Sequence, residues 1–168
     1  VALSILMGWT LALAPVVCRA APRLPEAGLN AEMAHHWEKA ITVYRDTLAR
    51  EPWRTDLWLR LADIQATLGR REEGIASLLH ANKTSPKDPY LNAKLSRAYA
   101  ADNQPHKALA AIGRALRLAP GNVRYLRAQA KLATWAGATK LALRSYEELH
   151  RLDPEDPEVA LGLARALS

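Results

Sequence analysis

Residues 55–88 read TDLWLRLADIQATLGRREEGIASLLHANKTSPKD, and the pattern of this stretch returns along the chain every 34 residues. A proline marks the end of each period, at Pro52, Pro86, Pro120 and Pro154. Seventeen residues before each proline is a helix-ending position, occupied by His35, Gly69, Asn103 and Gly137. Because Gly and Asn tolerate the left-handed backbone that stops a helix, each period is predicted to hold two helices joined by a tight turn.

Two further positions of each period favour close packing of these helices. A small residue stands twelve residues before each proline, at Ala40, Gly74, Ala108 and Ala142. A larger aromatic or aliphatic residue follows four places later, at Tyr44, Leu78, Ile112 and Tyr146. The small residues let two helix backbones approach each other, so the pattern predicts an array of helix-turn-helix units.

On these residues the chain resembles the tetratricopeptide repeat (TPR) family, over about residues 26–168. Other family positions agree, with small residues at Ala62, Ser96, Ala130 and Ala164 and leucines just before them at Leu61, Leu95 and Leu163. There are departures, since Gln129 stands where a leucine belongs, and Thr47 and Leu149 replace an alanine. The resemblance implies an all-α fold, a right-handed superhelical solenoid of antiparallel helix pairs.

The period divides the chain into segments. We predict a signal peptide or membrane anchor at 1–20, a degenerate first repeat at 21–54, repeats at 55–88, 89–122 and 123–156, and the first helix of a further, truncated repeat at 157–168. First helices are expected near 56–68, 90–102 and 124–136, and second helices near 71–84, 105–118 and 139–152. The first repeat has a poor first helix, at 26–34, which is weakened by Gly28. Because natural arrays end with a polar capping helix, the chain is expected to continue beyond Ser168 or to dock this edge on a partner or a second copy.

The N-terminal segment predicts export. Residues 1–17 carry no charge and are mostly apolar, and a small-x-small cleavage site follows, ending at Ala20. The alternative is an uncleaved membrane anchor, because the run approaches the ~20 residues that a spanning helix needs. Either alternative places the repeats in the periplasm or at the envelope of a bacterium. Cleavage after Ala20 would also remove Cys18, the one cysteine of the chain.

Charge and motifs exclude several classes of function. The formal net charge is +6, and the dense basic runs that grip nucleic acid are missing, so no nucleic-acid partner is expected. The sequence has no Gly-rich phosphate loop, nucleophile elbow or HExxH motif, so we predict neither an enzyme nor a cofactor. His35 and His36 are neighbours that cannot face one site, and no third ligand accompanies them, so no metal site is predicted.

The first helices carry a candidate binding surface. In the TPR family these helices line a concave groove, and equivalent positions of successive repeats form columns along it. One column reads Asp63, Arg97, Lys131 and Arg165. With the residues around it, the predicted basic groove comprises Asp63, Tyr90, Lys94, Arg97, Arg124, Arg127, Lys131, Trp135 and Arg165. The alternative is a solvated face whose long side chains cover apolar neighbours.

The predicted function is a non-catalytic protein–protein interaction scaffold of the cell envelope. Its groove would take an acidic protein or peptide, or an anionic or neutral polysaccharide, and membrane contact would involve only residues 1–17. TPR domains that clamp chaperone tails use a Lys and Asn pair, and the matching face here has Leu59 and Asp63 instead. Two alternatives remain: the periplasmic arm of an outer-membrane exopolysaccharide exporter, or the arm of an enzyme whose catalytic domain lies beyond Ser168.

Overall fold

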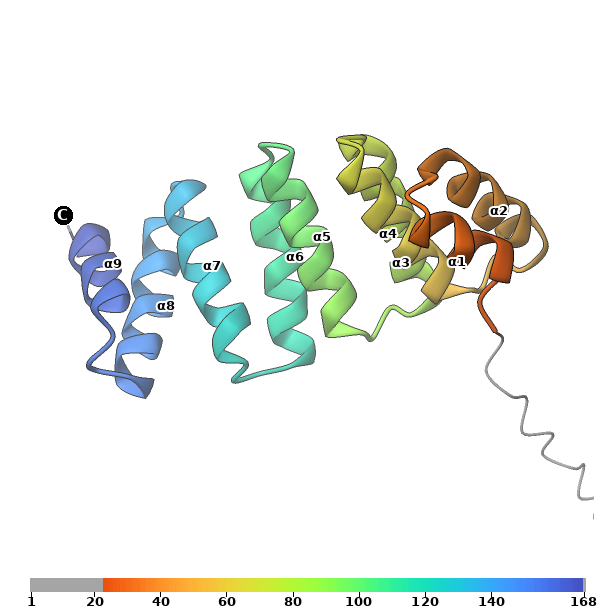
Figure 1. Cartoon of the computed structure of the whole chain (residues 1–168). Helices are drawn as coiled ribbons and strands as arrows, with labels where there is room; N and C mark the ends of the chain where they lie inside the picture. Colours follow the sequence, from red (N-terminus) through yellow and green to blue (C-terminus); the bar gives the residue numbers. More distant parts are fainter. Residues whose placement is uncertain (1–22, 168) are drawn as a thin grey trace, which may run out of the picture.

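The computed structural model describes residues 23–167, which form nine α-helices and no strand (Figure 1). The first helices of the pairs are α1 (Glu26–Met33), α3 (Thr55–Thr67), α5 (Pro89–Ala101), α7 (Val123–Trp135) and α9 (Pro157–Leu167). The second helices are α2 (Trp37–Arg50), α4 (Arg71–Thr84), α6 (Pro105–Leu118) and α8 (Thr139–Leu152). The predicted all-α fold is confirmed. The predicted signal peptide or anchor at residues 1–20 lies outside the described residues.

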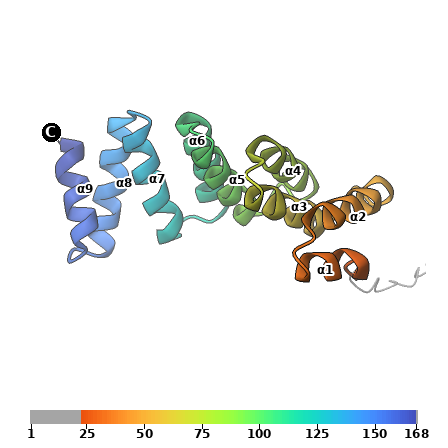
Figure 2. The same cartoon turned by 45° about the horizontal axis from the view of Figure 1, so that its top comes forward.

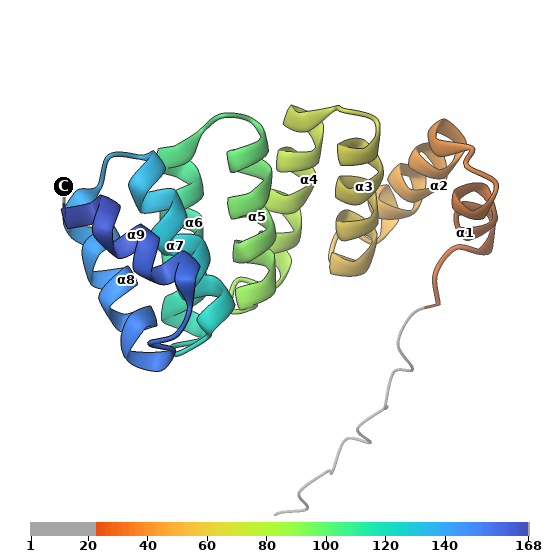
Figure 3. The same cartoon turned by 60° about the vertical axis from the view of Figure 1, so that its left-hand side comes forward.

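The helices stack in chain order. Each helix packs against the next one along the chain, and α7 also contacts α9. Figures 2 and 3 show the same order from two other directions, with α1 at one end of an elongated stack and α9 at the other. Helices of about this length are marginal when isolated in water, so their stability comes from packing against neighbours. None of the helices within residues 23–167 is long and apolar enough to cross a bilayer.

The predicted turns between the helices of each pair are confirmed by the backbone. Four residues at the predicted helix-ending positions have φ between 55° and 72°, namely His35, Gly69, Asn103 and Gly137. In the turn after α3, the amide of Arg70 donates to the carbonyl of Gln65 at 2.8 Å, and the other three turns contain the equivalent bond. These bonds satisfy carbonyls that the end of a helix leaves without a donor.

Side-chain caps start three of the first helices. The Asp88 carboxylate accepts from the amide of Tyr90 at 2.8 Å, and the Asn122 side chain accepts from the amide of Tyr125 at 3.2 Å. At α9, Asp156 accepts from the amides of the second and third helical residues at 2.9 and 3.2 Å. Each bond satisfies an amide that lacks an intrahelical acceptor, so short-range chemistry fixes where these helices begin.

Small residues bring the paired helices together, as the sequence predicts. The small positions of the four second helices, Ala40, Gly74, Ala108 and Ala142, are all buried. In the third pair, the buried Ser96 hydroxyl donates to the backbone carbonyl of Ala108 at 2.8 Å, a bond that joins α5 directly to α6. In the fourth pair, Gln129 takes the place of a leucine and accepts a hydrogen bond from Ser145 at 3.2 Å.

Gly28 is a packing residue rather than only a weakness of α1. A Cβ atom at this position would lie 2.4 Å from the ring of Tyr44, which is fully buried against α1. Gly162 of α9 has the same relation to Tyr146 of α8, with a separation of 2.2 Å. Any side chain at either glycine would push the tyrosine ring away, so the absence of a Cβ sets the helix spacing at both ends of the array.

Candidate ligand-binding groove

Two pockets lie side by side along the first helices. The α3–α5 pocket has a volume of about 460 Å³, and Asp63, Arg71, Lys94 and Arg97 are among the residues that line it. The α5–α7 pocket has a volume of about 480 Å³ and lies between α5 and α7 above the buried Ile112 of α6. Lys94 and Arg97 line both pockets. We call the two together the first-helix groove.

The α5–α7 pocket combines an apolar interior with a charged rim. Its apolar lining comes from Ala93, Ala100, Ile112, Ala128 and Leu132. Two tyrosines, Tyr90 and Tyr125, also line it. Ser96 and four cations complete the lining; the cations are Lys94, Arg97, Arg124 and Lys131. An apolar hollow with several convergent polar groups is the usual form of a ligand-binding site.

Acids of the chain itself already hold both lysines of the groove. Lys94 lies 2.5 and 2.7 Å from the two carboxylate oxygens of Asp63, and its ammonium also sits 5.5 Å from the centre of the Tyr90 ring. Lys131 lies 2.6 Å from Glu158 of α9. Within residues 23–167, no carboxylate pairs with Arg97 or Arg124. These two guanidinium groups, on neighbouring first helices, are the cations that the α5–α7 pocket offers to a ligand.

Six of the nine predicted groove residues line the first-helix groove. Tyr90, Lys94, Arg97, Arg124 and Lys131 line the α5–α7 pocket, and Asp63 lines the α3–α5 pocket. The other three line neither pocket. Trp135 is 48% exposed at the end of α7, and Arg165 is exposed on α9.

Arg127 is the third of these residues, and it is committed to α9. It lies 2.6 Å from Asp156 and 3.3 Å from Glu158. The hydrogen bond from Arg127 is the main cause that lowers the pKa of Asp156, whereas the pKa of Glu158 is lowered chiefly by Lys131. Both acids are therefore ionised at neutral pH, and they tie the start of α9 to α7.

Two side chains that line the groove are not among the residues that the sequence predicts for it. Arg71 belongs to the second helix α4, so a search restricted to first helices does not reach it. Tyr125 is half-buried on α7 and lines the pocket opposite Tyr90 of α5. The helical spacing of Tyr125 from Ala128 and Leu132, which line the same pocket, is the signal that could have found it.

The positive charge is concentrated in the middle of the array. Residues 89–152, from α5 to α8, contain 11 Lys and Arg against 3 Asp and Glu, a balance of +8. Residues 23–88 contain 10 of each kind. The net positive charge of the chain therefore comes from this middle segment, whereas the N-terminal part is balanced. The α5–α7 pocket lies within the positive segment, where an anionic ligand is attracted most strongly.

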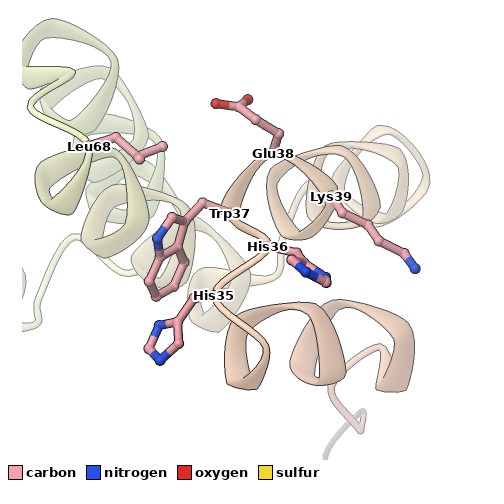
Figure 4. A pocket seen from close by; sticks show the side chains of 6 residues that line it. All are labelled: His35, His36, Trp37, Glu38, Lys39 and Leu68. Carbon is pink, nitrogen blue, oxygen red and sulfur yellow. The ribbon is translucent and has the colours of Figure 1, made fainter.

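A separate pocket lies at the turn between α1 and α2. It has a volume of about 450 Å³ and is lined by His35, His36, Trp37, Glu38, Lys39 and Leu68. The rings of His35 and Trp37 meet edge to face, with centroids 5.2 Å apart. Figure 4 shows Glu38 pointing away from the two histidines, and the Glu38 carboxylate accepts from Arg70. In the described part of the chain, no three His, Cys, Asp or Glu residues are grouped as a metal site requires.

Comparison with known proteins bears on the fold. Residues 33–93 match the family model of the tetratricopeptide repeat. The crystal structure of MamA is 17% identical with a TM-score of 0.71, and the match covers 86% of this chain and 84% of that one. A TPR protein from Parabacteroides merdae ATCC 43184 is 17% identical with a TM-score of 0.71 over 83% of this chain and 56% of its own. YrrB, a TPR protein with an unusual peptide-binding site, is 14% identical with a TM-score of 0.69 over 83% and 72%.

A search of curated proteins gave no match. The family match and the structural neighbours nevertheless agree with the 34-residue period and with the paired helices of the structure. Residues 33–93 therefore match the tetratricopeptide repeat by sequence, and the described residues share the fold of solved tetratricopeptide repeat proteins.

Proposed function

We propose that this chain is a non-catalytic scaffold of protein–protein interaction, and that an extended acidic segment of a partner protein binds in the first-helix groove. The observation that carries the proposal is the α5–α7 pocket, in which an apolar interior is flanked by Arg97 and Arg124. An apolar side chain of the partner would fill the pocket, and burial would contribute about 1.5–3 kcal/mol for a residue such as leucine. Carboxylates of the partner would bind the two guanidinium groups, whose planar forks suit carboxylates.

The groove favours a peptide over other anionic ligands. Its two pockets share Lys94 and Arg97, so an extended chain can cross both without leaving the surface. TPR proteins generally act as non-catalytic scaffolds, and the similar fold of YrrB bears a peptide-binding site. A sugar polymer would call for a longer row of aromatic rings than Tyr90 and Tyr125 provide.

Charge reversal in the groove tests this proposal. The ligand is a fluorescein-labelled peptide of about twelve residues that alternates Glu with Leu and Ser, long enough to cross both pockets at about 3.3 Å per residue. The double variant Arg97→Glu/Arg124→Glu is expected to bind at least about a hundredfold more weakly, because each of the two lost charge-assisted hydrogen bonds contributes roughly 1.5–3 kcal/mol. Fluorescence anisotropy measures the Kd.

The matched control is Arg117→Glu/Arg144→Glu, which makes the same charge change at exposed residues of α6 and α8 outside the groove. This control is expected to weaken binding only slightly. An equal loss in both double variants would show that the peptide responds to the overall charge of the chain, and would remove the groove from the account. Circular dichroism checks that all variants keep their helical content.

Export to a bacterial envelope forms part of the proposal and rests on residues 1–20. The mass of the protein recovered from an expressing bacterium tests it. A mature chain that begins at Ala21 in the periplasmic fraction supports export with cleavage. A full-length chain in the membrane fraction supports an anchor, and a full-length chain in the cytoplasm contradicts both.

A further inference from the structure

On each side of the α5–α7 pocket, a carboxylate of the chain itself forms an ion pair with a lysine that lines the pocket. Asp63 of α3 holds Lys94 of α5, with both carboxylate oxygens within 2.7 Å of the ammonium nitrogen. Glu158 of α9 holds Lys131 of α7 at 2.6 Å. In both cases the acid lies on the first helix next to the one that carries the lysine. The same arrangement therefore appears on both sides of the pocket.

The carboxylates of both acids are exposed to solvent, so water or a ligand can reach them. The side chains of Asp63 and Glu158 are 64% and 55% exposed. The Glu158–Lys131 pair is exposed on both sides and contributes little to folding, because water and salt screen it, whereas Lys94 is only 17% exposed beneath Asp63. Neither carboxylate accepts a bond from a backbone amide of its own helix. Both carboxylates are therefore open to solvent and to replacement by the carboxylate of a ligand.

Asp156 provides the contrast. Its side chain is 14% exposed, caps the start of α9 and pairs with Arg127 at 2.6 Å. It therefore attaches α9 to α7 through a largely buried carboxylate, and Glu158 adds an exposed contact with Arg127 at 3.3 Å. Glu158 also pairs with Lys131, which lines the groove. The contacts with Arg127 explain the attachment of α9 but leave the Glu158–Lys131 pair unexplained.

Resting on the proposed function, we infer that Asp63 and Glu158 are internal competitors for the groove, whose carboxylates hold Lys94 and Lys131 in place of the acids of a partner. A bound acidic segment displaces them and takes over the two lysines. Lys94 and Lys131 stand on neighbouring first helices, with the α5–α7 pocket between them. The matching segment therefore carries two acids separated by a few residues, with an apolar side chain between them for the pocket.

This role sets the specificity of the groove. A ligand with one acid gains too little binding free energy to displace both internal carboxylates, so it competes poorly with them for the two lysines. A ligand with two correctly spaced acids replaces both. Removing an internal acid relieves the competition, so Asp63→Asn and Glu158→Gln should each tighten the binding of such a ligand. The gain is expected to be about two- to fivefold for each, as for the loss of an exposed ion pair.

The experiment measures Kd by fluorescence anisotropy for the whole chain. The ligand is a labelled peptide with two glutamates three positions apart and a leucine between them. Asp63→Asn, Glu158→Gln and their double variant are compared with the unchanged chain. The matched control is Glu148→Gln, which adds the same charge but removes an exposed pair with Arg151 on α8, outside the groove. A second peptide, with the two glutamates adjacent, tests the spacing.

The inference predicts tighter binding for both groove variants, a larger gain for the double variant and no gain for Glu148→Gln. It also predicts a smaller gain with the adjacent-glutamate peptide. An equal gain in Glu148→Gln would overturn it, because net charge alone would explain the effect. Unchanged Kd values in the groove variants would overturn it too, while binding that still depends on Arg97 and Arg124 would leave the proposed function standing. A peptide that no variant binds contradicts both.

Discussion

At the scale of single residues, two glycines beneath tyrosine rings determine how closely the end helices approach. Gly28 faces Tyr44, and Gly162 faces Tyr146. Sequence reasoning alone treats Gly28 as a cost to helix α1, because glycine lowers helix propensity wherever it stands. Its role depends on the place of a ring that comes from another helix, and no local pattern reveals that contact.

The first prediction concerns these glycines. Gly28→Ala is expected to lower the free energy of unfolding by about 1–3 kcal/mol, because the overpacked ring of Tyr44 outweighs the gain in helix propensity. Gly113→Ala is the control, since a Cβ there would meet its nearest neighbours at 3.8 and 3.9 Å, an ordinary contact. This control should be neutral or raise the stability by up to about 1 kcal/mol. Urea unfolding measures both, and a neutral result for Gly28→Ala would contradict the packing role.

At the scale of one element, α9 is held on α7 by charge as well as by apolar contact. Val159 is buried, and Leu163 packs against the same cluster. Arg127 adds ion pairs to Asp156 and Glu158. The pKa values of both acids are lowered below their usual 3.8 and 4.5. Their contribution to stability is therefore complete above these usual values and is lost as the pH falls through the lowered ones.

The second prediction follows from that sign. Protection of the α9 amides from hydrogen exchange, corrected for intrinsic rates, is expected to fall as the pH drops below about 4.5, whereas α5 should change little. Arg127→Gln removes the charge on α7. It should reduce α9 protection already at pH 6 and should flatten the pH dependence. Protection of α9 that stays constant to pH 3 would show that apolar packing alone holds this helix.

Elements also show what the sequence could predict. The helix-ending positions at Gly69 and Asn103 were predicted correctly, because the backbone conformation there depends on a few adjacent residues. The cationic column on the first helices was also visible, since a fixed period places equivalent residues on neighbouring helices.

Which groove cations form ion pairs within the chain could not be predicted from that column. The partner of Lys94 is 31 residues away at Asp63, and the partner of Lys131 is Glu158, on α9. Such pairs depend on how far side chains reach across neighbouring repeats, and the position of each residue within the period does not give that reach. The same limit explains why Arg127, on the same helix as Arg124, turned out to serve α9.

At the scale of the whole molecule, the array has a charge gradient along its length. The balanced N-terminal part is followed by a segment from α5 to α8 with a balance of +8, and the four acids of residues 153–158 come next. The α5–α7 pocket lies in the positive segment. Glu158 of α9 pairs with Lys131, which lines this pocket from α7. If an acidic partner binds as proposed, the positive segment would guide it to the groove, and raising the salt concentration should weaken its binding.

Hydrogen exchange on the chain with and without the acidic peptide tests the central claim most directly. If the peptide binds in the first-helix groove, side chains of α3, α5 and α7 become covered, and the amides of these helices and of the turns beside the two pockets should gain protection. The second helices α6 and α8 should change least, although α8 carries exposed arginines. Protection that appears on α6 and α8 while α5 and α7 stay unchanged would contradict the account, because the ligand would then lie on the opposite helices.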